Sequence, residues 1–204
     1  MGYTTYVVAC LLAIVPLIGD FVVNASDNRL AKSLSDNLTH GVIGFLTWLL
    51  VCVHYAHVSA YVLLAESAAC CLAVWGGEEV AASAIDVDHF VAARSVYLEN
   101  ALQLKSRPFL HCTSIPLLVF GIGVVVGYVL KYSMMKRYSW LLIAALLSHH
   151  IRDSTRRGLW LWPCGTTYPL PYYLYVIITV LIPFLIVAGM KLTDTTYNYD
   201  TISV

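Results

Sequence analysis

The chain has 204 residues, of which 59% are apolar and only 12% are charged, and its formal net charge is zero. Soluble domains carry about 25% charged residues, so this composition excludes an ordinary soluble protein, and the neutral balance gives no reason to expect a nucleic-acid partner. The apolar runs are long enough for membrane helices rather than barrel strands, and we expect an all-α, polytopic integral membrane protein with about five to six transmembrane helices.

The apolar runs predict the helices in chain order. Helices are expected at about residues 3–23, 36–56, 59–75, 108–130, 138–152 and 172–191, with a polar loop at 24–35 and a long loop at 155–171. The third region is ambiguous, because the sequence GGEE at 76–79 interrupts an apolar stretch that resumes at 80–85. Residues 59–85 therefore form either one kinked crossing or more than one. We expect a single helical membrane domain over 1–204, with its motif-bearing core at about 35–179.

Aspartate and histidine residues gather where these predicted helices begin or end. If residues 59–85 cross the membrane an odd number of times, these ends all lie at one membrane face. Ionisable groups at membrane depth are costly and mark functional sites. The residues concerned are Asp20, Asp36, His40, Asp86, Asp88, His89, His111, His149, His150 and Asp153.

The spacing of these residues favours metal binding. Asp36 with His40 and His149 with Asp153 are four apart, and Asp86 with His89 are three apart, so each pair shares one face of a helix. Imidazole with carboxylate suits Zn²⁺, Mn²⁺ or Fe²⁺ better than Mg²⁺ or Ca²⁺. Three pairs exceed the needs of one structural zinc, and we expect a site with two or three ions. The predicted metal ligands are His40, Asp86, His89, His111, His149 and Asp153.

Four further residues have predicted catalytic roles. Asp36 or Asp88 would act as the general base, or would orient a ligand. Arg152 or Arg156 would stabilise an anionic transition state, because guanidinium forks match phosphate oxygens. Each has a simpler alternative: Asp36 could cap the second helix, and the arginines could anchor the chain to lipid headgroups. His150 lies off the face shared by His149 and Asp153 and is expected to orient rather than bind.

Several segments together resemble the animal transmembrane protein 267 family. They are SDNLTHGVIG at 35–44, IDVDHFVAARS at 85–95, RPFLHC at 107–112, SHHIRD at 148–153, GLW at 158–160, PLP at 169–171 and LYVIIT at 174–179. The resemblance spans about residues 35–179 and implies a multi-pass helical membrane protein.

That family in turn resembles the bacterial YdjM-like inner-membrane proteins, which are predicted metal-dependent hydrolases. Their pattern has an N-terminal His, a D-[IL]-D-H block, an H-R-G-x-T-H block and an S-H-x-x-x-D block. The resemblance implies that His40, residues 86–89, His111, and His149 with Asp153 hold metal. The wider resemblance is to zinc-dependent phospholipase C and P1 nuclease, helical enzymes with clustered zinc. One departure is that Ser106 stands where the H-R-G-x-T-H block has its first His.

The leading hypothesis is a membrane-bound, metal-dependent hydrolase that acts on a phosphate or acyl ester, of a lipid, at the membrane interface. Its cofactor would be a divalent metal ion, most readily Zn, with Mn or Fe as alternatives. Its expected partner is membrane lipid, both as the surrounding bilayer and as a substrate. The first alternative is a catalytically inactive multi-pass protein with a structural or partner-binding role, which Ser106 favours. The second is an ion- or proton-coupled transporter whose pathway uses Asp20, Glu66 and the histidines. The absence of an internal repeat in the sequence argues against a transporter.

The distribution of Lys and Arg predicts the orientation. More of them lie at the motif-bearing face than at the other, and the positive-inside rule then places that face in the cytoplasm. The sequence identifies neither a protein partner nor an organelle.

Overall fold

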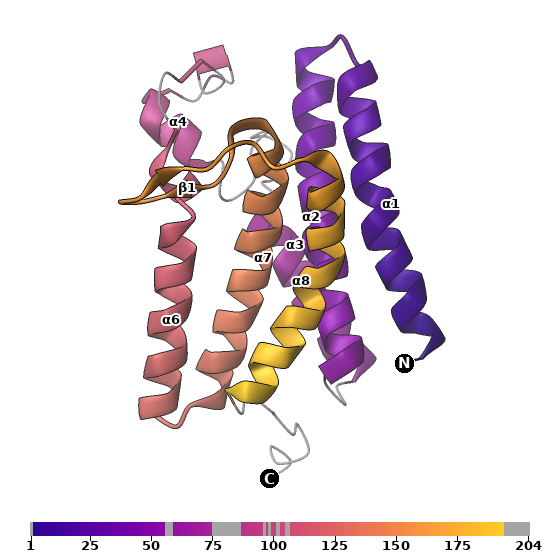
Figure 1. Ribbon diagram of the computed structural model, residues 1–204, viewed down its shortest axis with the longest axis vertical. Helices are drawn as coiled ribbons and strands as arrows, with labels where there is room; N and C mark the ends of the chain where they lie inside the picture. The colour runs from indigo at the N-terminus through magenta and orange to yellow at the C-terminus, as the bar shows by residue number, and fades with distance from the viewer. Residues whose placement is uncertain are drawn as a thin grey trace.

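The computed structural model describes residues 2–55, 59–74, 87–95, 97, 99–100, 103–104 and 107–193. These residues form a helical bundle with one small hairpin near its end (Figure 1). In chain order the elements are α1 (Tyr3–Ala25), α2 (Arg29–Tyr55), α3 (Ala60–Val74), α4 (Val87–Ala93), the 3₁₀ turn η1 (Phe109–His111), α6 (Ser114–Val129), α7 (Ser133–Arg157), β1 (Trp160–Leu161), β2 (Gly165–Thr166) and α8 (Tyr172–Leu192). The prediction of an all-α polytopic membrane protein is confirmed.

The described helices differ in how they suit a bilayer. Three of them, α1, α2 and α8, are long and apolar enough to cross a membrane, and α3 and α6 are shorter apolar helices. By contrast, α7 is 25 residues long and rich in polar side chains, yet it runs the length of the bundle (Figure 1). Its polar residues, among them Arg137, His149 and Arg152, are buried against its neighbours. Because α7 lies inside the bundle, its polar side chains face protein rather than lipid.

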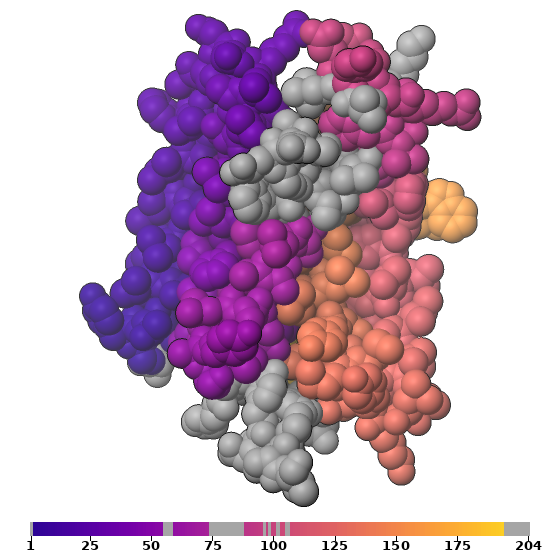
Figure 2. All heavy atoms as spheres, turned by 180° about the vertical axis from the view of Figure 1, so that it is seen from behind, coloured from indigo at the N-terminus to yellow at the C-terminus, as the bar shows by residue number. Residues whose placement is uncertain are grey.

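The core lies where α2, α3, α7 and α8 meet. Ala144 and Ala145 of α7 are completely buried there beside Trp48, Tyr175 and other large side chains. Seen from behind, α3 lies between the α1–α2 pair and α7 (Figure 2). A second apolar cluster joins α1 to α2 through Leu12, Ile43 and neighbouring residues. Small residues on α7 allow close helix packing, as is common in membrane bundles.

Glycine permits two further close approaches. A Cβ atom on Gly19 of α1 would lie 2.2 Å from Oγ1 of Thr39 on α2, and one on Gly189 of α8 would lie 2.2 Å from Cη2 of Trp140 on α7. No side chain larger than hydrogen fits at either contact without displacement. These glycines therefore set how near α1 approaches α2, and how near α8 approaches α7.

The second helix begins earlier than the sequence predicted. The expected polar loop at 24–35 is wrong in its second half, because α2 starts at Arg29. Asn28 accepts hydrogen bonds from the backbone N–H of Leu30 at 2.8 Å and of Ala31 at 3.3 Å, so it caps the helix. The alternative that Asp36 caps the helix is also wrong, since Asp36 lies about two turns inside α2.

The predicted helix at 108–130 is interrupted near its start. Cys112 pairs with Trp160 of the hairpin, and the N–H of Thr113 donates to the carbonyl oxygen of Trp160 at 2.8 Å. Because the hairpin engages this backbone, η1 ends at His111 and α6 begins only at Ser114. The helix predicted at 138–152 is longer than expected, from Ser133 to Arg157.

One end of the bundle carries most of the predicted motif residues, and we call it the motif end: the end of α1, the start of α2, α4, η1, the end of α7 and the start of α8. Figure 1 shows α4 and the α1–α2 connection at this same end. Of the third region the structure describes α3 only, so one crossing or more by residues 59–85 stays an open prediction. Residues 75–86, with the GGEE sequence and Asp86, lie outside the described residues, as does Ser106.

Candidate metal centre at the motif end

Four elements bring histidine and aspartate side chains together at the motif end. The helix α2 contributes His40, and α7 contributes His149 and Asp153. The short helix α4 contributes Asp88 and His89, and η1 contributes His111. These side chains form two groups of three: His40, His149 and Asp153 are the Asp153 group, and Asp88, His89 and His111 are the Asp88 group.

The Asp153 group is centred on one carboxylate. Oδ1 of Asp153 lies 3.4 Å from Nε2 of His40, and Oδ2 lies 3.1 Å from Nε2 of His149. The rings of His40 and His149 stack with their centroids 4.1 Å apart. The helical spacing of His149 and Asp153 does place both side chains on one face of α7, as the sequence predicted. Since His40 comes from another helix, the group joins α2 to α7.

The Asp88 group is centred on a second carboxylate. Oδ1 of Asp88 lies 3.4 Å from Nδ1 of His89 and 3.4 Å from Nδ1 of His111. Its Oδ2 accepts a 2.7 Å hydrogen bond from the backbone N–H of Leu110, which ties α4 to η1. Burial opposes ionisation of Asp88, but the imidazoles of His111 and His89 outweigh it and hold the pKa of this carboxyl below its ordinary value.

His111 lies between the two groups. Its Nδ1 faces Asp88, while its Nε2 lies 3.6 Å from Oδ2 of Asp153. Its ring centroid is 4.6 Å from that of His89 and 5.5 Å from that of His149. The two groups are therefore adjacent parts of one centre rather than separate sites.

The donor set fits divalent ions. In each group, two imidazole nitrogens and one carboxylate oxygen lie within 4.8 Å of one another. Among the described residues, the buried Oδ1 of Asp88 has no hydrogen-bond partner, although two imidazole nitrogens face it. A buried carboxylate oxygen needs a donor or a cation. Three protein ligands of this kind are also the usual number in catalytic zinc sites.

His150 holds η1 in place beside this centre. Its Nε2 lies 3.1 Å from the carbonyl oxygen of Leu110, and its Nδ1 lies 2.9 Å from Oγ1 of Thr113. A carbonyl only accepts, so Nε2 carries the proton and donates, and in the neutral ring Nδ1 accepts from the Thr113 hydroxyl. His150 thereby fixes the backbone on both sides of His111, and it points away from the two carboxylates of the centre. The orienting role expected from the sequence stays a prediction, and these two contacts support it.

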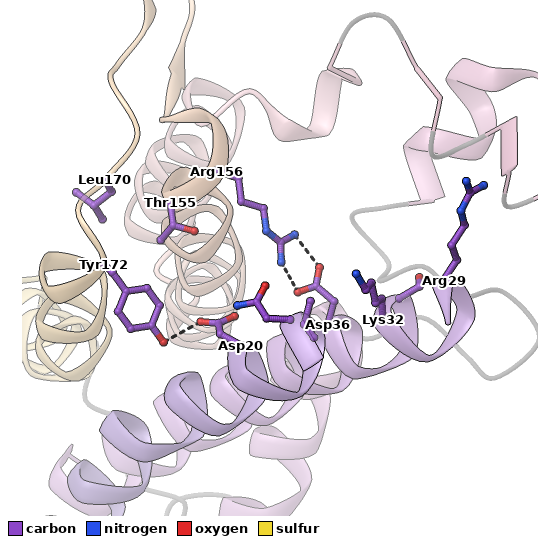
Figure 3. A pocket seen from close by; sticks show the side chains of 11 residues that line it. Asp20, Arg29, Lys32, Asp36, Thr155, Arg156, Leu170 and Tyr172 are labelled. Atoms are coloured by element: carbon purple, nitrogen blue, oxygen red, sulfur yellow. Dashed lines mark hydrogen bonds and ion pairs between the residues drawn. The ribbon is translucent and has the colours of Figure 1, made fainter. Parts of the chain in front are cut away.

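Asp36 and Arg152, two of the predicted catalytic residues, bind each other instead of joining either group. Arg152 is only 2% exposed and pairs with both Asp36 and Asp20, the latter at 2.6 Å. Arg156 makes two hydrogen bonds to Asp36, of 2.7 and 2.9 Å, and Tyr172 donates to Asp20 at 3.0 Å (Figure 3). This network joins α1, α2, α7 and α8. Arg156 differs from Arg152 in being 48% exposed, so it is the accessible cation of the pair.

The structure therefore brings together five of the six predicted ligands: His40, His89, His111, His149 and Asp153. The sixth, Asp86, lies outside the described residues. Asp88, predicted as a general base or an orienting residue, is itself the carboxylate of one group. Sequence reasoning did not find the links from Asp20 to Arg152 and Tyr172. The sequence feature that could have indicated these links is Asp20 itself, a single charged residue near the end of the first apolar helix that requires a partner.

Comparison with known proteins finds relatives among vertebrates. The chain is 40% identical to transmembrane protein 267 of Mus musculus over 170 residues, which cover 82% of this chain and 73% of that protein. It is 39% identical to transmembrane protein 267 of Xenopus laevis over 165 residues, or 80% of this chain and 71% of the relative. No family model matches the chain, and no solved structure matches it significantly.

Proposed function

Since this chain belongs to the transmembrane protein 267 family of multi-pass membrane proteins, we propose that its histidine–aspartate centre makes it a metal-dependent hydrolase of a phosphate or acyl ester, carried by a lipid, at the membrane interface. The observation that supports the proposal most is the pairing of two groups, each with two imidazoles and one carboxylate, with His111 between them. Packing alone gives no reason to gather so many ionisable groups at a bundle end. The YdjM-like pattern in the sequence would imply the same chemistry, with Ser106 as its departure.

Each group would hold one divalent ion, with zinc the first candidate and manganese or iron the alternatives. The Asp153 group offers His40, His149 and Asp153, and the Asp88 group offers Asp88, His89 and His111, with Asp86 as a further ligand predicted from the sequence. When bound, such ions supply Lewis-acid activation of water and of the ester oxygens at neutral pH. The chain's own contribution is to fix the ligands on four elements and to exclude water from one side of the centre.

Each group has one member that is partly exposed. Asp153 is 29% exposed and His89 is 25% exposed, whereas Asp88 is 2% exposed. We propose that a substrate enters from the Asp153 side, because the exposed Arg156 also lies there. The exposed Arg156 follows Asp153 by three residues on α7 and is the cation best placed to stabilise an anionic transition state. Asp36 holds the Arg156 guanidinium in place, which supports a positioning role for Asp36 in preference to the general-base role.

Lipid is the substrate class that best fits the surroundings. The helices α1, α6 and α8 expose many large apolar side chains along their length, as a lipid-facing surface does, among them Phe21, Ile122 and Leu185. The centre lies at the end of these helices, which would bring it to the level of the ester groups of bilayer lipids.

The first test is metal content, measured by mass spectrometry on detergent-purified protein. Wild type is expected to retain about two ions per chain, in keeping with a two-metal site. The His149→Ala/Asp153→Ala variant is expected to lose at least one of them. His54→Ala is the matched control, because His54 lies in the last turn of α2, far from the motif end. A folded wild-type protein that stays metal-free after incubation with zinc or manganese would make the centre a polar packing network.

Hydrolysis itself needs a second measurement. Metal-loaded protein in mixed lipid vesicles is assayed for released phosphate, headgroup and fatty acid, beside the His149→Ala/Asp153→Ala variant. Turnover that depends on metal and on these two residues is expected. Full metal occupancy with no release from phosphate or acyl esters would contradict the hydrolase proposal and leave the metal centre standing.

A further inference from the structure

A pocket of about 540 Å³ opens at the motif end beside the candidate metal centre (Figure 3). Side chains from α1, α2, α7 and α8 line it, so it lies where four helices end together. Arg29, Lys32 and Asp36 follow one another along α2, and Arg156 faces Asp36 from α7. The proposed hydrolytic chemistry does not account for this concentration of cations.

The charges around the pocket do not balance. Two carboxylates, Asp20 and Asp36, are paired with Arg152 and Arg156. Arg29 and Lys32 remain, and within the described part of the chain neither makes an ion pair. Arg152 does not itself line the pocket, but when it is counted with its two carboxylate partners the charges around the pocket have a surplus of two positive charges. Such a surplus attracts an anion.

Arg156 retains donors for such an anion. A guanidinium has five N–H groups, and the hydrogen bonds to Asp36 use one on each terminal nitrogen. The side chain is about half exposed and lines the pocket, so the remaining N–H groups are accessible. Arginine held by a carboxylate on one edge is pre-organised to bind phosphate on another.

The pocket and the metal centre share two helices. On α7, Arg156 lies three residues after Asp153, and on α2, Asp36 lies four residues before His40. Each spacing is about one helical turn, or about 5 Å along the axis. An anionic group held at Arg156 would therefore lie about one turn from the exposed side of the Asp153 group.

The pocket also has apolar side chains in its lining, and exposed aromatic residues follow two of its lining residues in the chain. Val23 and Leu170 line it. Phe21 on α1 is 72% exposed, and Tyr173 on α8 is also exposed, beside the lining residue Tyr172. A cationic pocket with apolar side chains in and beside it suits a molecule with an anionic head and hydrocarbon chains.

From these observations we propose that the pocket between α1, α2, α7 and α8 binds the phosphate of a phospholipid headgroup, with Arg29, Lys32 and Arg156 as its cationic contacts. A phosphomonoester headgroup fits the surplus of two positive charges best, since it carries nearly two negative charges at neutral pH. The inference rests on the proposed function in one respect only, namely that it narrows the substrate of the proposed hydrolase to phosphate-bearing lipids. Binding itself requires neither metal nor turnover.

The test is a binding titration of the full-length protein in neutral detergent, with a chelator present so that no turnover occurs. The probes are a fluorescent short-chain phosphatidate, the matching uncharged diacylglycerol, and glycerol phosphate. The Arg29→Gln/Lys32→Gln variant is expected to bind phosphatidate at least about tenfold more weakly, because each basic residue near an anionic lipid contributes substantially to binding. The Lys131→Gln/Lys191→Gln variant removes two exposed charges outside the motif end and is expected to bind like wild type.

The outcomes separate the possible sources of the phosphate. Phosphatidate binding that exceeds both glycerol phosphate and diacylglycerol by about tenfold or more supports a lipid headgroup. Equal binding of glycerol phosphate and phosphatidate would overturn the lipid assignment in favour of a soluble phosphate ester. An equal loss of phosphatidate affinity in both double variants would overturn the assignment of this pocket as the binding site. Unchanged affinity in Arg29→Gln/Lys32→Gln would overturn it as well. Failure of the hydrolase assay leaves these results unchanged, so the two proposals fail independently.

Discussion

His111 on η1 and Asp153 on α7 face each other across the motif end, with Nε2 of His111 3.6 Å from Oδ2 of Asp153. The same imidazole turns its Nδ1 toward Asp88. One side chain on a three-residue turn thus connects two groups of potential ligands from α2, α4 and α7. If the centre binds metal as proposed, the position of this turn would decide whether it holds two neighbouring ions or one.

We therefore predict that His111→Ala reduces metal content more than His89→Ala does, because His111 belongs to the Asp88 group and also lies 3.6 Å from Asp153. His89→Ala is expected to remove about one ion per chain, because the Asp153 group stays complete. His111→Ala is expected to remove one ion and to weaken the binding of the other. Metal analysis after dialysis against a series of chelator concentrations measures both effects, and identical chelator curves for the two variants would contradict the bridging position of His111.

His150 is predicted to act through the position of His111. Loss of its hydrogen bonds to Leu110 and Thr113 in His150→Ala frees the η1 backbone. Residues that orient metal ligands typically change metal affinity by about 10–100-fold when they are removed. Zinc titrations are expected to show that loss of affinity, with the number of ions unchanged at saturation. A lower number of ions at saturating zinc would instead make His150 a ligand.

A second buried polar cluster is predicted to stabilise the fold without taking part in the metal centre. Arg137 on α7 donates to Glu66 on α3 through Nε at 2.7 Å and Nη2 at 2.5 Å, and Trp48 on α2 donates to the same carboxylate at 3.0 Å. All three side chains are buried. Breaking a buried ion pair by removing one partner costs about 3–5 kcal/mol, because the other charge stays buried. Glu66→Leu should lower the thermal unfolding midpoint markedly.

The matched variant for this pair is Glu66→Leu/Arg137→Leu. It removes both charges and is expected to be more stable than Glu66→Leu alone. Metal content per folded chain should stay at the wild-type value in both. A double variant less stable than the single would show that the polar cluster is not an isolated pair, and loss of metal in either would place Glu66 in the same functional network as the motif end.

The contact between Gly19 and Thr39 is predicted to tolerate no added side chain. In Gly19→Ala the new Cβ would lie 2.2 Å from Oγ1 and 2.5 Å from Cγ2 of Thr39, so α1 must move away from α2. Overpacking of this kind costs about 1–3 kcal/mol. Gly121→Ala on α6 is the control, since no other atom lies within 4 Å of the position of its Cβ. Equal thermal stability of the two variants would contradict the close approach of α1 and α2.

The composition and the spacing within single helices were informative because they are local properties. The chain is 59% apolar, and its long apolar segments can enter a bilayer only if their backbone N–H and C=O groups bond to each other, as they do in helices. His149 and Asp153 lie on one face of α7 because 3.6 residues make one turn, whatever surrounds the helix. The sequence by itself therefore determined the membrane class, the order of the long helices and the orientation of this pair.

The same local rule gave an incomplete picture of Asp36 and His40. They also lie one turn apart on α2, yet His40 faces Asp153 while Asp36 binds Arg152 and Arg156. Their partners come from α7, more than 100 residues later in the chain. The axial position of α7 relative to α2 decides that His40 faces a carboxylate and Asp36 faces guanidinium groups. Packing between the helices sets this position, and the spacing within one helix carries no information about it.

Asp88 and Arg152 show most clearly what only the tertiary structure decided. Asp88 is placed among the histidines by the position of η1, which depends on the hairpin that engages Cys112 and Thr113. The sequence predicted the same role for Arg152 and Arg156. In the structure Arg152 is buried between Asp20 and Asp36, whereas Arg156 stays accessible at the pocket. Burial of a charge depends on which neighbours surround it, and these neighbours come from four helices far apart in the chain. The sequence determined which residues could do chemistry, and the packing of the bundle decided which of them face one another.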